Sequence, residues 1–243
     1  MAVLITGGSG RLGKELRKIF PDALAPKHEE LDITNIERVK QYVSQFKFDM
    51  TIHCAALAGI NQCEENRKLA WETNVLGTEN LIKTCTEFSP DCYFVYISTA
   101  CVFYGDRGNY SEDDIPYPKN FYSLTKLLGE FVVKSNSQIK SLITRTNFSS
   151  RERWPYPKAF IDRFGTYLLA EDVAVAIKEV TEKAITGVVH IVGSRKLSMY
   201  ELAKITTPDI EPMTLAEYQG PPLTINMSLD TIRWKKYEIG TGI

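Results

Sequence analysis

The chain has 243 residues, a formal net charge of −1 at pH 7, and 44% hydrophobic and 24% charged residues. These values are typical of an ordinary globular protein, and the length suffices for one full core with a modest appendage. Because the lysines and arginines are scattered rather than clustered, we expect neither nucleic acid nor a membrane surface as a partner. Small anions are the better candidates.

No apolar run approaches the ~18 residues of a membrane-spanning helix, and the first strand begins without a basic leader. The five cysteines contain no C-x-x-C pair, and the three histidines are dispersed. Metal centres and disulfide frameworks need characteristic ligand spacings, so we expect neither. A soluble, cytoplasmic protein is the expectation that follows.

A short apolar run at 2–6 predicts a buried strand. Gly7, Gly10 and Gly13 follow it at once and lead into an amphipathic helical segment at 11–20. Glycine permits a tight turn, close backbone approach to a diphosphate, and close packing of the next helix, whose free N–H groups then point at the anion. In this position the glycines predict a dinucleotide-binding loop. An ordinary glycine-rich turn between strand and helix is the alternative.

The second predicted strand, at 23–25, is followed by a basic pair, Lys27 and His28. Enzymes that use NAD usually place an acid there to accept from the ribose 2′-hydroxyl, whereas a basic residue accommodates the 2′-phosphate of NADP. The pair therefore favours NADP. If Glu29 or Glu30 reached back to the ribose, NAD would be favoured, and it stays open as a cofactor.

The rest of the first 193 residues alternates in the same way. Strand-like runs are expected at 50–54, 92–98, 141–145 and 188–192, and helical segments at 35–46, 64–88, 120–134 and 171–184. Alternating strands and helices predict an α/β fold, a doubly wound parallel sheet of the Rossmann type that binds ligands at the carboxyl ends of its strands. We expect this domain to comprise residues 1–146 and about 169–193. Residues of about 147–168 and 194–243 are expected to form a small C-terminal cap that binds substrate.

Tyr122 and Lys126 are one helical turn apart in a predicted helix, and Thr99 follows a predicted strand. An enzyme that transfers hydride between a nicotinamide and a carbonyl needs a proton donor, and a nearby cation favours ionisation of a phenol. Together with the glycine loop, this set predicts a reductase. The alternative for the tyrosine and lysine alone is a solvated helix face.

Several motifs in the same order and spacing resemble the extended short-chain dehydrogenase/reductases. They are TGGSGRLG at 6–13, LDIT at 31–34, HCAALAG at 53–59, TNVLGTENL at 73–81, ISTACVF at 97–103 and YSLTK at 122–126. Within that superfamily, the segment 97–130 is most similar to the dTDP-4-dehydrorhamnose reductases and their shorter sugar-nucleotide-binding relatives. The resemblance covers about the first 146 residues well and thins over the cap, which is shorter than in those reductases.

The resemblance implies that Tyr122 is the general acid that protonates the substrate carbonyl. Lys126 would favour the phenolate and hold the ribose hydroxyls, Thr99 would hydrogen-bond the carbonyl, and Asn74 would support the lysine or a relay water. It also implies a larger cofactor set, with Asp32 beside the adenine, although an Asp before Asn35 is equally suited to a turn or helix cap. The complete cofactor set is Gly7, Ser9, Gly10, Arg11, Leu12, Gly13, Lys27, His28, Asp32, Ile33, Ala55, Ala56, Ala58, Tyr122 and Lys126.

The chain departs from those reductases at two positions near the sugar: Ala100 where an acid is common, and Phe148 where a tryptophan is common. A cationic and aromatic surface for a nucleotide base and diphosphate could come from 151–154, Lys158 and Arg163. These residues could equally close the cap on the core. The expected substrate-binding set is Thr99, Ala100, Phe148, Arg151 and Trp154.

Three functions remain open from the sequence. The first is NADPH-dependent reduction of a nucleotide-activated 4-keto-6-deoxy sugar such as dTDP-4-dehydrorhamnose. The second is an epimerase or dehydratase of the same superfamily, although dehydratases usually carry acids beside the threonine where this chain has Ala100 and Cys101. The third is a non-catalytic, dinucleotide-binding regulatory subunit similar to the β subunit associated with methionine adenosyltransferase. The expected partner is a small-molecule nucleotide sugar. A homodimer is a further possibility.

Overall fold

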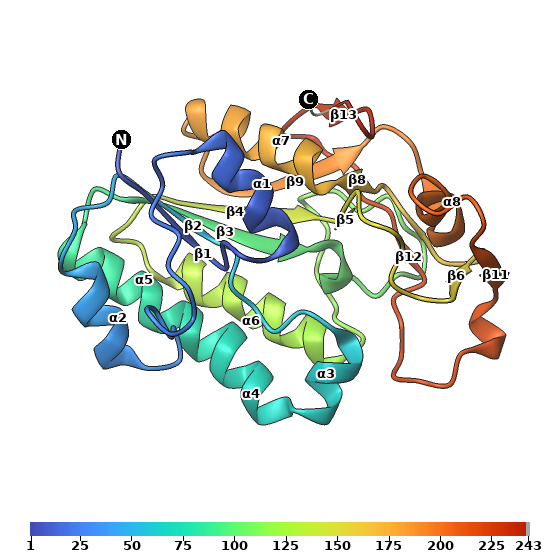
Figure 1. The fold of residues 1–243 in the computed structure, drawn as a ribbon, viewed down its shortest axis with the longest axis horizontal. Coiled ribbons are helices and arrows are strands. Elements are labelled where there is room, and N and C mark those ends of the chain that lie inside the picture. The colour runs from blue at the N-terminus through green and yellow to red at the C-terminus, as the bar shows by residue number, and fades with distance from the viewer. Residues whose placement is uncertain (242–243) are drawn as a thin grey trace.

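A computed structural model describes residues 1–241 of the chain. Its centre is a six-stranded sheet in which every neighbouring pair is parallel. The strand order confirms the α/β, doubly wound prediction (Figure 1). The strands, in spatial order, are β1 (Val3–Thr6), β2 (Met50–His53), β3 (Tyr93–Thr99), β4 (Ser141–Thr146), β9 (Gly187–Gly193) and β13 (Lys236–Tyr237).

The predicted strand at 23–25 is reduced to one residue, Leu24, which forms an isolated parallel bridge with Leu4. Leu24 N–H donates to the Val3 carbonyl and Ile5 N–H donates to the Leu24 carbonyl. Pro26 has no N–H to continue the pairing. The chain therefore leaves β1 on one side and β2 pairs with it on the other, which places a topological switch point at the carboxyl end of β1.

Helices cover both faces of the sheet (Figure 1). On one face, α1 (Arg11–Ile19) and α7 (Ala170–Glu182) bury a core with alternate residues of the strands. On the other, α2 (Ile36–Val43), α5 (Gly77–Phe88) and α6 (Phe121–Ser135) enclose a second core. Both faces of the strands are thus buried, as a parallel sheet requires.

The single helix predicted over 64–88 is divided. It begins earlier with α3 (Ile60–Glu65), breaks at Asn66, and continues through α4 (Arg67–Trp71) and a π-helical turn, η1 (Glu72–Leu76), into α5. Hydrophobic spacing does not reveal a π turn, because the backbone stays helical through it. The turn buries Asn74.

Short strands from 148–227 gather at the carboxyl end of the sheet, where the strand arrows of Figure 1 point. We call them the small lobe. They pair as β5 (Phe148–Ser149) with β8 (Leu168–Leu169), β6 (Lys158–Phe160) with β11 (Glu211–Met213), and β7 (Phe164–Gly165) with both β10 (Leu197–Ser198) and β12 (Asn226–Met227). The lobe also holds α8 (Met199–Lys204) and the 3-10 turn η3 (Leu215–Glu217).

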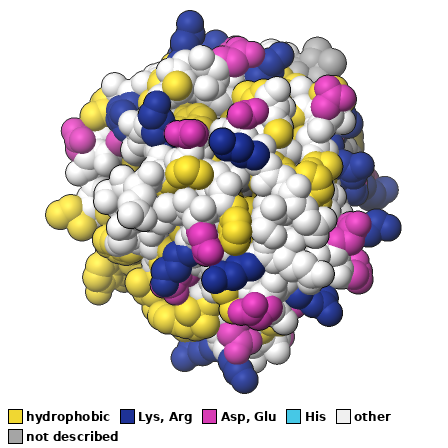
Figure 2. Space-filling view, turned by 90° about the vertical axis from the view of Figure 1, so that its left-hand side faces the viewer, with side chains coloured by type: hydrophobic (Ala, Val, Ile, Leu, Met, Phe, Trp, Pro, Cys, Tyr) yellow, Lys and Arg dark blue, Asp and Glu magenta, His cyan; other side chains and the backbone are white. Residues whose placement is uncertain are grey.

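The two-part division of the chain stays a prediction. One part of the expected cap, β13, pairs with β9 at the edge of the main sheet. On the face opposite the small lobe, basic and acidic side chains are interleaved rather than separated (Figure 2). None of the helices within residues 1–241 is long and apolar enough to cross a membrane.

Candidate cofactor and catalytic site

The loop after β1 has positions at which only glycine fits. Gly7 has φ +69°, and a Cβ there would lie 2.7 Å from the Ala55 nitrogen. A Cβ at Gly13 would collide with the Gly7 carbonyl, to which Gly10 N–H donates at 2.9 Å. The turn is therefore closed over the start of α1 and pressed against the residues that follow β2, so side chains are excluded for steric reasons.

The N-terminus of α1 is open to a ligand. Gly10 is its N-cap and supplies no side-chain acceptor, and the first turn contains no acidic residue. Ser9 and Arg11 are exposed, whereas Leu12 is buried in the core and offers only its backbone. Free N–H groups at the positive end of a helix bind anions, so this loop fits the diphosphate of a dinucleotide.

A buried histidine joins β1, β2 and α5. Thr6 Oγ1 lies 2.7 Å from His53 Nδ1, and His53 Nε2 lies 3.0 Å from Thr78 Oγ1. Burial, aided by the charge of Lys126, lowers the pKa of His53 to about 3, so the ring is neutral. Because Thr78 already donates to the Asn74 carbonyl, its oxygen accepts from Nε2–H, and Nδ1 accepts from Thr6. His53 is a structural support at the edge of the site.

Asn74 fastens the loop after β2 to α6. Its Oδ1 accepts from Leu57 N–H at 2.8 Å, and its Nδ2 donates to the Leu57 carbonyl at 3.1 Å and to Thr125 Oγ1 at 2.9 Å. The side chain thus holds residues 55–58, the loop expected to contact the cofactor, against the helix that carries Tyr122. These bonds use both N–H donors of the amide and one of the two lone pairs of Oδ1, and the expected support of Lys126 stays a prediction.

Tyr122 and Lys126 both lie on α6, and Thr99 is the last residue of β3. Two caps fix where α6 begins: Asn120 Oδ1 accepts from Ser123 N–H, and Glu64 Oε1 accepts from Phe121 N–H. The carboxyl ends of β1, β2 and β3 adjoin at the edge of the sheet that bears the glycine loop. The Thr99 side chain hydrogen-bonds that of Tyr122, and the charge of Lys126 acts on His53 at the end of β2, so the three residues converge at this edge.

Burial keeps the phenol of Tyr122 in its protonated form. Burial raises the pKa of Tyr122 well above its usual value, Cys101 and Cys63 act in the same direction, and the Thr99 side chain acts against them. The phenol is therefore protonated at neutral pH. The expected lowering of the Tyr122 pKa by Lys126 is not found: the pKa is raised instead, and the Lys126 ammonium lies 4.1 Å from the centroid of the Tyr96 ring.

Lys126 is buried, and burial lowers its pKa to about 8, while the carboxylate of Glu130 raises it. Glu130 is itself fully buried and makes a bidentate pair with Arg145, with Nε–Oε1 at 2.9 Å and Nη2–Oε2 at 2.7 Å. Ser98, the neighbour of Thr99, donates to the same carboxylate at 2.6 Å. The network ties α6 to β3 and β4 one helical turn beyond Lys126.

The position of His53 at the end of an apolar run predicts a packed or hydrogen-bonded histidine, and its two hydrogen bonds confirm that. Sequence reasoning missed Tyr96 and Glu130 as supports. Glu130 has a usable signal, because it follows Lys126 by one helical turn on the same face. Tyr96 has none, since it is an ordinary aromatic residue of a buried strand. A Cβ at Gly129 would collide with the Tyr96 hydroxyl, so the glycine is what lets α6 pack this closely on β3.

The residues expected near the adenine cluster on the far side of β1. Lys27 and His28 are exposed, and Ile33 is buried. Asp32 accepts from the backbone and side chain of Thr34. Although partial burial acts to raise it, those bonds and the charge of His28 hold the pKa of Asp32 below its usual value. Asp32 thus caps a turn here, and its contact with adenine stays a prediction.

A cleft of about 690 Å³ separates the loop after β2 from the small lobe. Ala58 to Gln62 line one side. Trp154 and Tyr156 line the other, edge to face with ring centroids 5.9 Å apart. Tyr218 donates to Asn61 Oδ1 at 3.2 Å and so bridges the two sides. Of the expected substrate residues, Trp154 therefore faces the cleft.

The other expected substrate residues lie elsewhere. Arg151 is exposed and pairs with Glu171 at 2.6 Å, at the start of α7. Phe148 packs against the core under α1 and α7. Ala100 is fully buried in η2 (Ala100–Val102), the 3-10 turn after β3. Their substrate contacts stay predictions.

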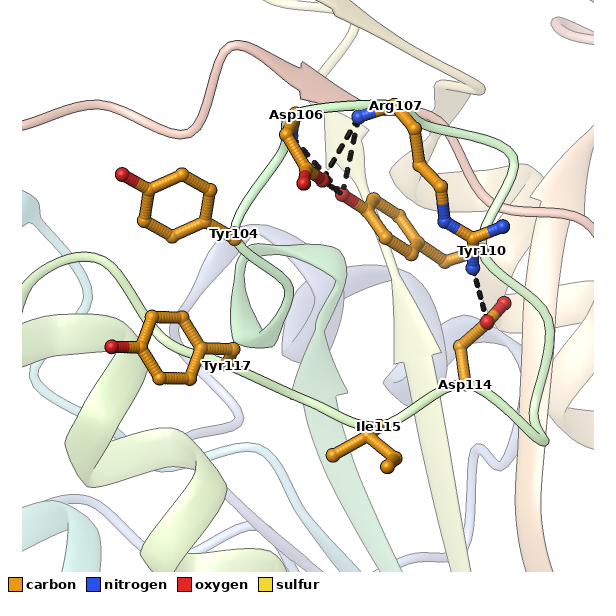
Figure 3. Close-up of a pocket in the computed structure, with 7 residues that line it drawn as sticks. All are labelled: Tyr104, Asp106, Arg107, Tyr110, Asp114, Ile115 and Tyr117. Carbon is orange, nitrogen blue, oxygen red and sulfur yellow. Dashed lines mark hydrogen bonds and ion pairs between the residues drawn. The ribbon is translucent and has the colours of Figure 1, made fainter.

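The loop from β3 to α6 lines a second pocket, of about 450 Å³ (Figure 3). The Tyr110 ring stacks on Phe103 with centroids 4.4 Å apart, and its hydroxyl donates to Asp106. Arg107 pairs with Asp114 on the side of the pocket opposite Tyr104 and Tyr117 (Figure 3). These contacts make the loop a fixed connection between Thr99 and Tyr122.

The fold and the site define a dinucleotide-binding α/β protein of the extended short-chain dehydrogenase/reductase type. The model of the RmlD substrate binding domain family matches residues 1–153. The chain belongs to that family.

Relatives of two kinds are similar to the chain. The dTDP-4-dehydrorhamnose reductase of Aggregatibacter actinomycetemcomitans is 30% identical over 83% of this chain and 76% of its own. The methionine adenosyltransferase 2 subunit beta of Xenopus laevis is 28% identical over 98% of this chain and 82% of its own.

Among solved structures, the dTDP-4-dehydrorhamnose reductase of Bacillus anthracis in complex with NADP has a TM-score of 0.86 and 28% identity, covering 94% of this chain and 90% of that one. A hypothetical dTDP-4-dehydrorhamnose reductase from Sulfolobus tokodaii has a TM-score of 0.83 and 30% identity, covering 95% and 92%. The agreement over nearly the whole chain confirms the fold.

Proposed function

We propose that this protein is an NADPH-dependent reductase of a nucleotide-activated 4-keto-6-deoxy sugar, as its dTDP-4-dehydrorhamnose reductase relatives are by name. The observation that carries the proposal is the convergence of Thr99, Tyr122 and Lys126 on the edge of the sheet that also holds the glycine loop. The cleft between the loop after β2 and the small lobe, with Trp154 and Tyr156 on one wall, has the volume of a small-molecule site.

NADP is the proposed cofactor. Support comes from the open N-terminus of α1, the steric exclusion of side chains at Gly7 and Gly13, and the exposed Lys27 and His28. The Bacillus anthracis relative was solved with NADP. When bound, NADPH supplies the hydride.

The protein's own part in the reaction is to place and protonate the carbonyl. Tyr122, neutral because burial raises its pKa, donates its proton to the carbonyl oxygen. Thr99 donates a hydrogen bond to the same oxygen and stabilises the charge that develops there. Lys126, one helical turn from Tyr122, contributes a buried cation that would favour the phenolate left after proton transfer.

Tyr122→Phe tests the proposal. We expect turnover of NADPH with a panel of nucleotide keto sugars to fall at least about 100-fold, because general acid catalysis typically supplies that much, with cofactor affinity unchanged. Tyr117→Phe, an exposed tyrosine of the second pocket, is the matched control and should retain full activity. A fully active Tyr122→Phe variant removes the tyrosine from the mechanism.

A non-catalytic dinucleotide-binding subunit is the second candidate. The observation that favours it is the similarity to methionine adenosyltransferase 2 subunit beta over 98% of the chain. Ala100, where the reductases commonly carry an acid, agrees with it. Binding of NADP without turnover of any keto sugar, together with co-purification of a larger enzyme, would decide for this function. Net NADPH consumption would decide against it and against an epimerase or dehydratase.

We also propose a homodimer and a cytoplasmic location. Exposed apolar side chains on neighbouring helices supply a surface for self-association: Leu69 and Trp71 of α4, and Leu124 and Phe131 of α6. The five free cysteines suit a reducing compartment. Sedimentation of the purified protein and its Trp71→Glu variant tests the dimer.

A further inference from the structure

Arg163 is a buried cation without a counter-charge. Its side chain is 8% exposed, and no carboxylate within residues 1–241 forms an ion pair with it. Nε donates to the Thr224 carbonyl at 2.9 Å, Nη1 contacts the sulfur of Met199 at 3.1 Å, and Nη2 contacts that of Met227 at 3.7 Å. Thioethers are weak acceptors, so most of the guanidinium's hydrogen-bonding capacity and all of its charge remain unmatched.

The neighbouring cations differ from it. Arg151 pairs with Glu171, Arg153 pairs with Asp209 at 2.9 Å, and Lys158 pairs with Glu211 at 3.9 Å. All three of these cations are exposed. Arg163 alone of the four lines the cleft as a buried and unneutralised charge.

Arg163 also adjoins the catalytic edge. The Met227 sulfur that Nη2 contacts lies 3.4 Å from the sulfur of Cys101, two residues beyond Thr99. Burial raises the pKa of Tyr167, the charge of Arg163 acts against it, and the hydroxyl has no hydrogen-bond partner in the part of the chain that the structure describes. A second unsatisfied donor therefore lies near the same cation.

We propose that Arg163 is the anchor for the diphosphate of the nucleotide-linked substrate. The inference rests on the proposed function for the identity of the anion. A planar guanidinium with free donors matches phosphate oxygens in pairs, and burial strengthens the attraction. With the diphosphate at Arg163, the base meets the aromatic wall of Trp154 and Tyr156, and the attached sugar extends toward Thr99.

The test compares thymidine diphosphate with thymidine by calorimetric titration. In Arg163→Gln we expect about 10- to 100-fold weaker binding of the diphosphate, because hydrogen bonds to charged groups contribute that much. Binding of thymidine and of NADP should stay unchanged, the latter showing that the variant is folded. Arg153→Gln is the matched control and should bind all three ligands as the unaltered chain does.

Two further measurements keep the inference testable if Arg163→Gln does not fold. Arg163→Lys retains the charge and should lose less diphosphate affinity than the glutamine variant. In the unaltered chain, added salt should weaken binding of the diphosphate but not of thymidine. Equal losses in the two variants, unchanged diphosphate binding in Arg163→Gln, or salt-independent binding each overturn the assignment.

The two proposals fail separately. A chain that prefers thymidine diphosphate through Arg163 but never oxidises NADPH keeps the anion site and removes the reductase. Turnover of a nucleotide keto sugar with an unaltered KM in Arg163→Gln keeps the reductase and removes the anchor.

Discussion

The ammonium of Lys126 lies 4.1 Å from the centroid of the Tyr96 ring, inside the protein and over the face of an aromatic side chain. A buried cation in this position is stabilised by the ring's negative face. We therefore predict that Tyr96→Leu weakens the hold on the lysine and lowers kcat about threefold or more, since cation–π contacts contribute ~0.5–2 kcal/mol. Thermal melting and steady-state kinetics check this, with Tyr96→Phe, which keeps the ring, expected to retain activity.

The pH dependence of activity should follow Lys126. Its pKa of about 8 means that the side chain is cationic below that pH and neutral above it. If the cation is needed, kcat/KM, which reports groups of the free enzyme, falls as pH rises through about 8. Lys126→Arg, which stays charged, should be slower but flat across this range. If kcat/KM of the arginine variant still falls above about pH 8, the fall is due to the titration of another group.

Removing one partner of the buried Glu130–Arg145 ion pair should lower the free energy of unfolding. Glu130→Gln leaves the guanidinium of Arg145, 2% exposed, without its counter-charge. Removing one partner of a buried ion pair typically destabilises by about 3 to 5 kcal/mol. Chemical denaturation should show this loss, and Glu130→Gln combined with Arg145→Met should recover a substantial part of it. An additive double variant would mean that the pair does not act as a unit.

Cofactor binding should be abolished by a single methyl group in the glycine loop. Gly13→Ala places Cβ against the Gly7 carbonyl, so the loop must move away from α1. We expect loss of measurable NADPH binding, followed by the fluorescence of the reduced cofactor, with a melting transition still present. Retained affinity would show that the diphosphate does not bind on this loop.

Cofactor preference should depend on the basic pair after Leu24. Lys27→Ala removes an exposed cation from the expected 2′-phosphate site, so NADPH affinity should fall about fivefold, the scale of an exposed charge contact, while NADH affinity stays the same. Lys40→Ala, whose lysine pairs with Glu87 on the helices, is the matched control. Equal changes for both cofactors would place the phosphate elsewhere.

The Rossmann core was predictable because each of its elements carries its own local signal. Apolar runs marked β1 to β4, and helical spacing marked α1 and α6. The spacing of Tyr122 and Lys126 alone predicts that both lie on one face of α6. Such signals are read within a window of a few residues, and the catalytic edge follows from them because parallel strands end together.

The small lobe was less predictable because its strands are two or three residues long and pair across large separations, as β6 does with β11. From the sequence alone, Arg151 and Arg163 are both expected to be cations of one surface. What separates them is the position of Glu171, which neutralises the first and is remote from the second. An ion-pair partner that lies on another helix or strand cannot be predicted from the residues next to the arginine in the sequence.

The π turn at Glu72–Leu76 has a consequence for how this site can be lost. A π turn holds one residue more than the α-helical turn it replaces, so shortening the segment by one residue restores a regular helix at little local cost. The helices on either side keep their relative orientation, because the π turn had absorbed the extra residue locally, and the residues inside the turn shift by one position. Asn74 would swing away from Leu57 and Thr125 with its chemistry intact, and the tether between two arms of the active site would be undone by a change of chain length alone.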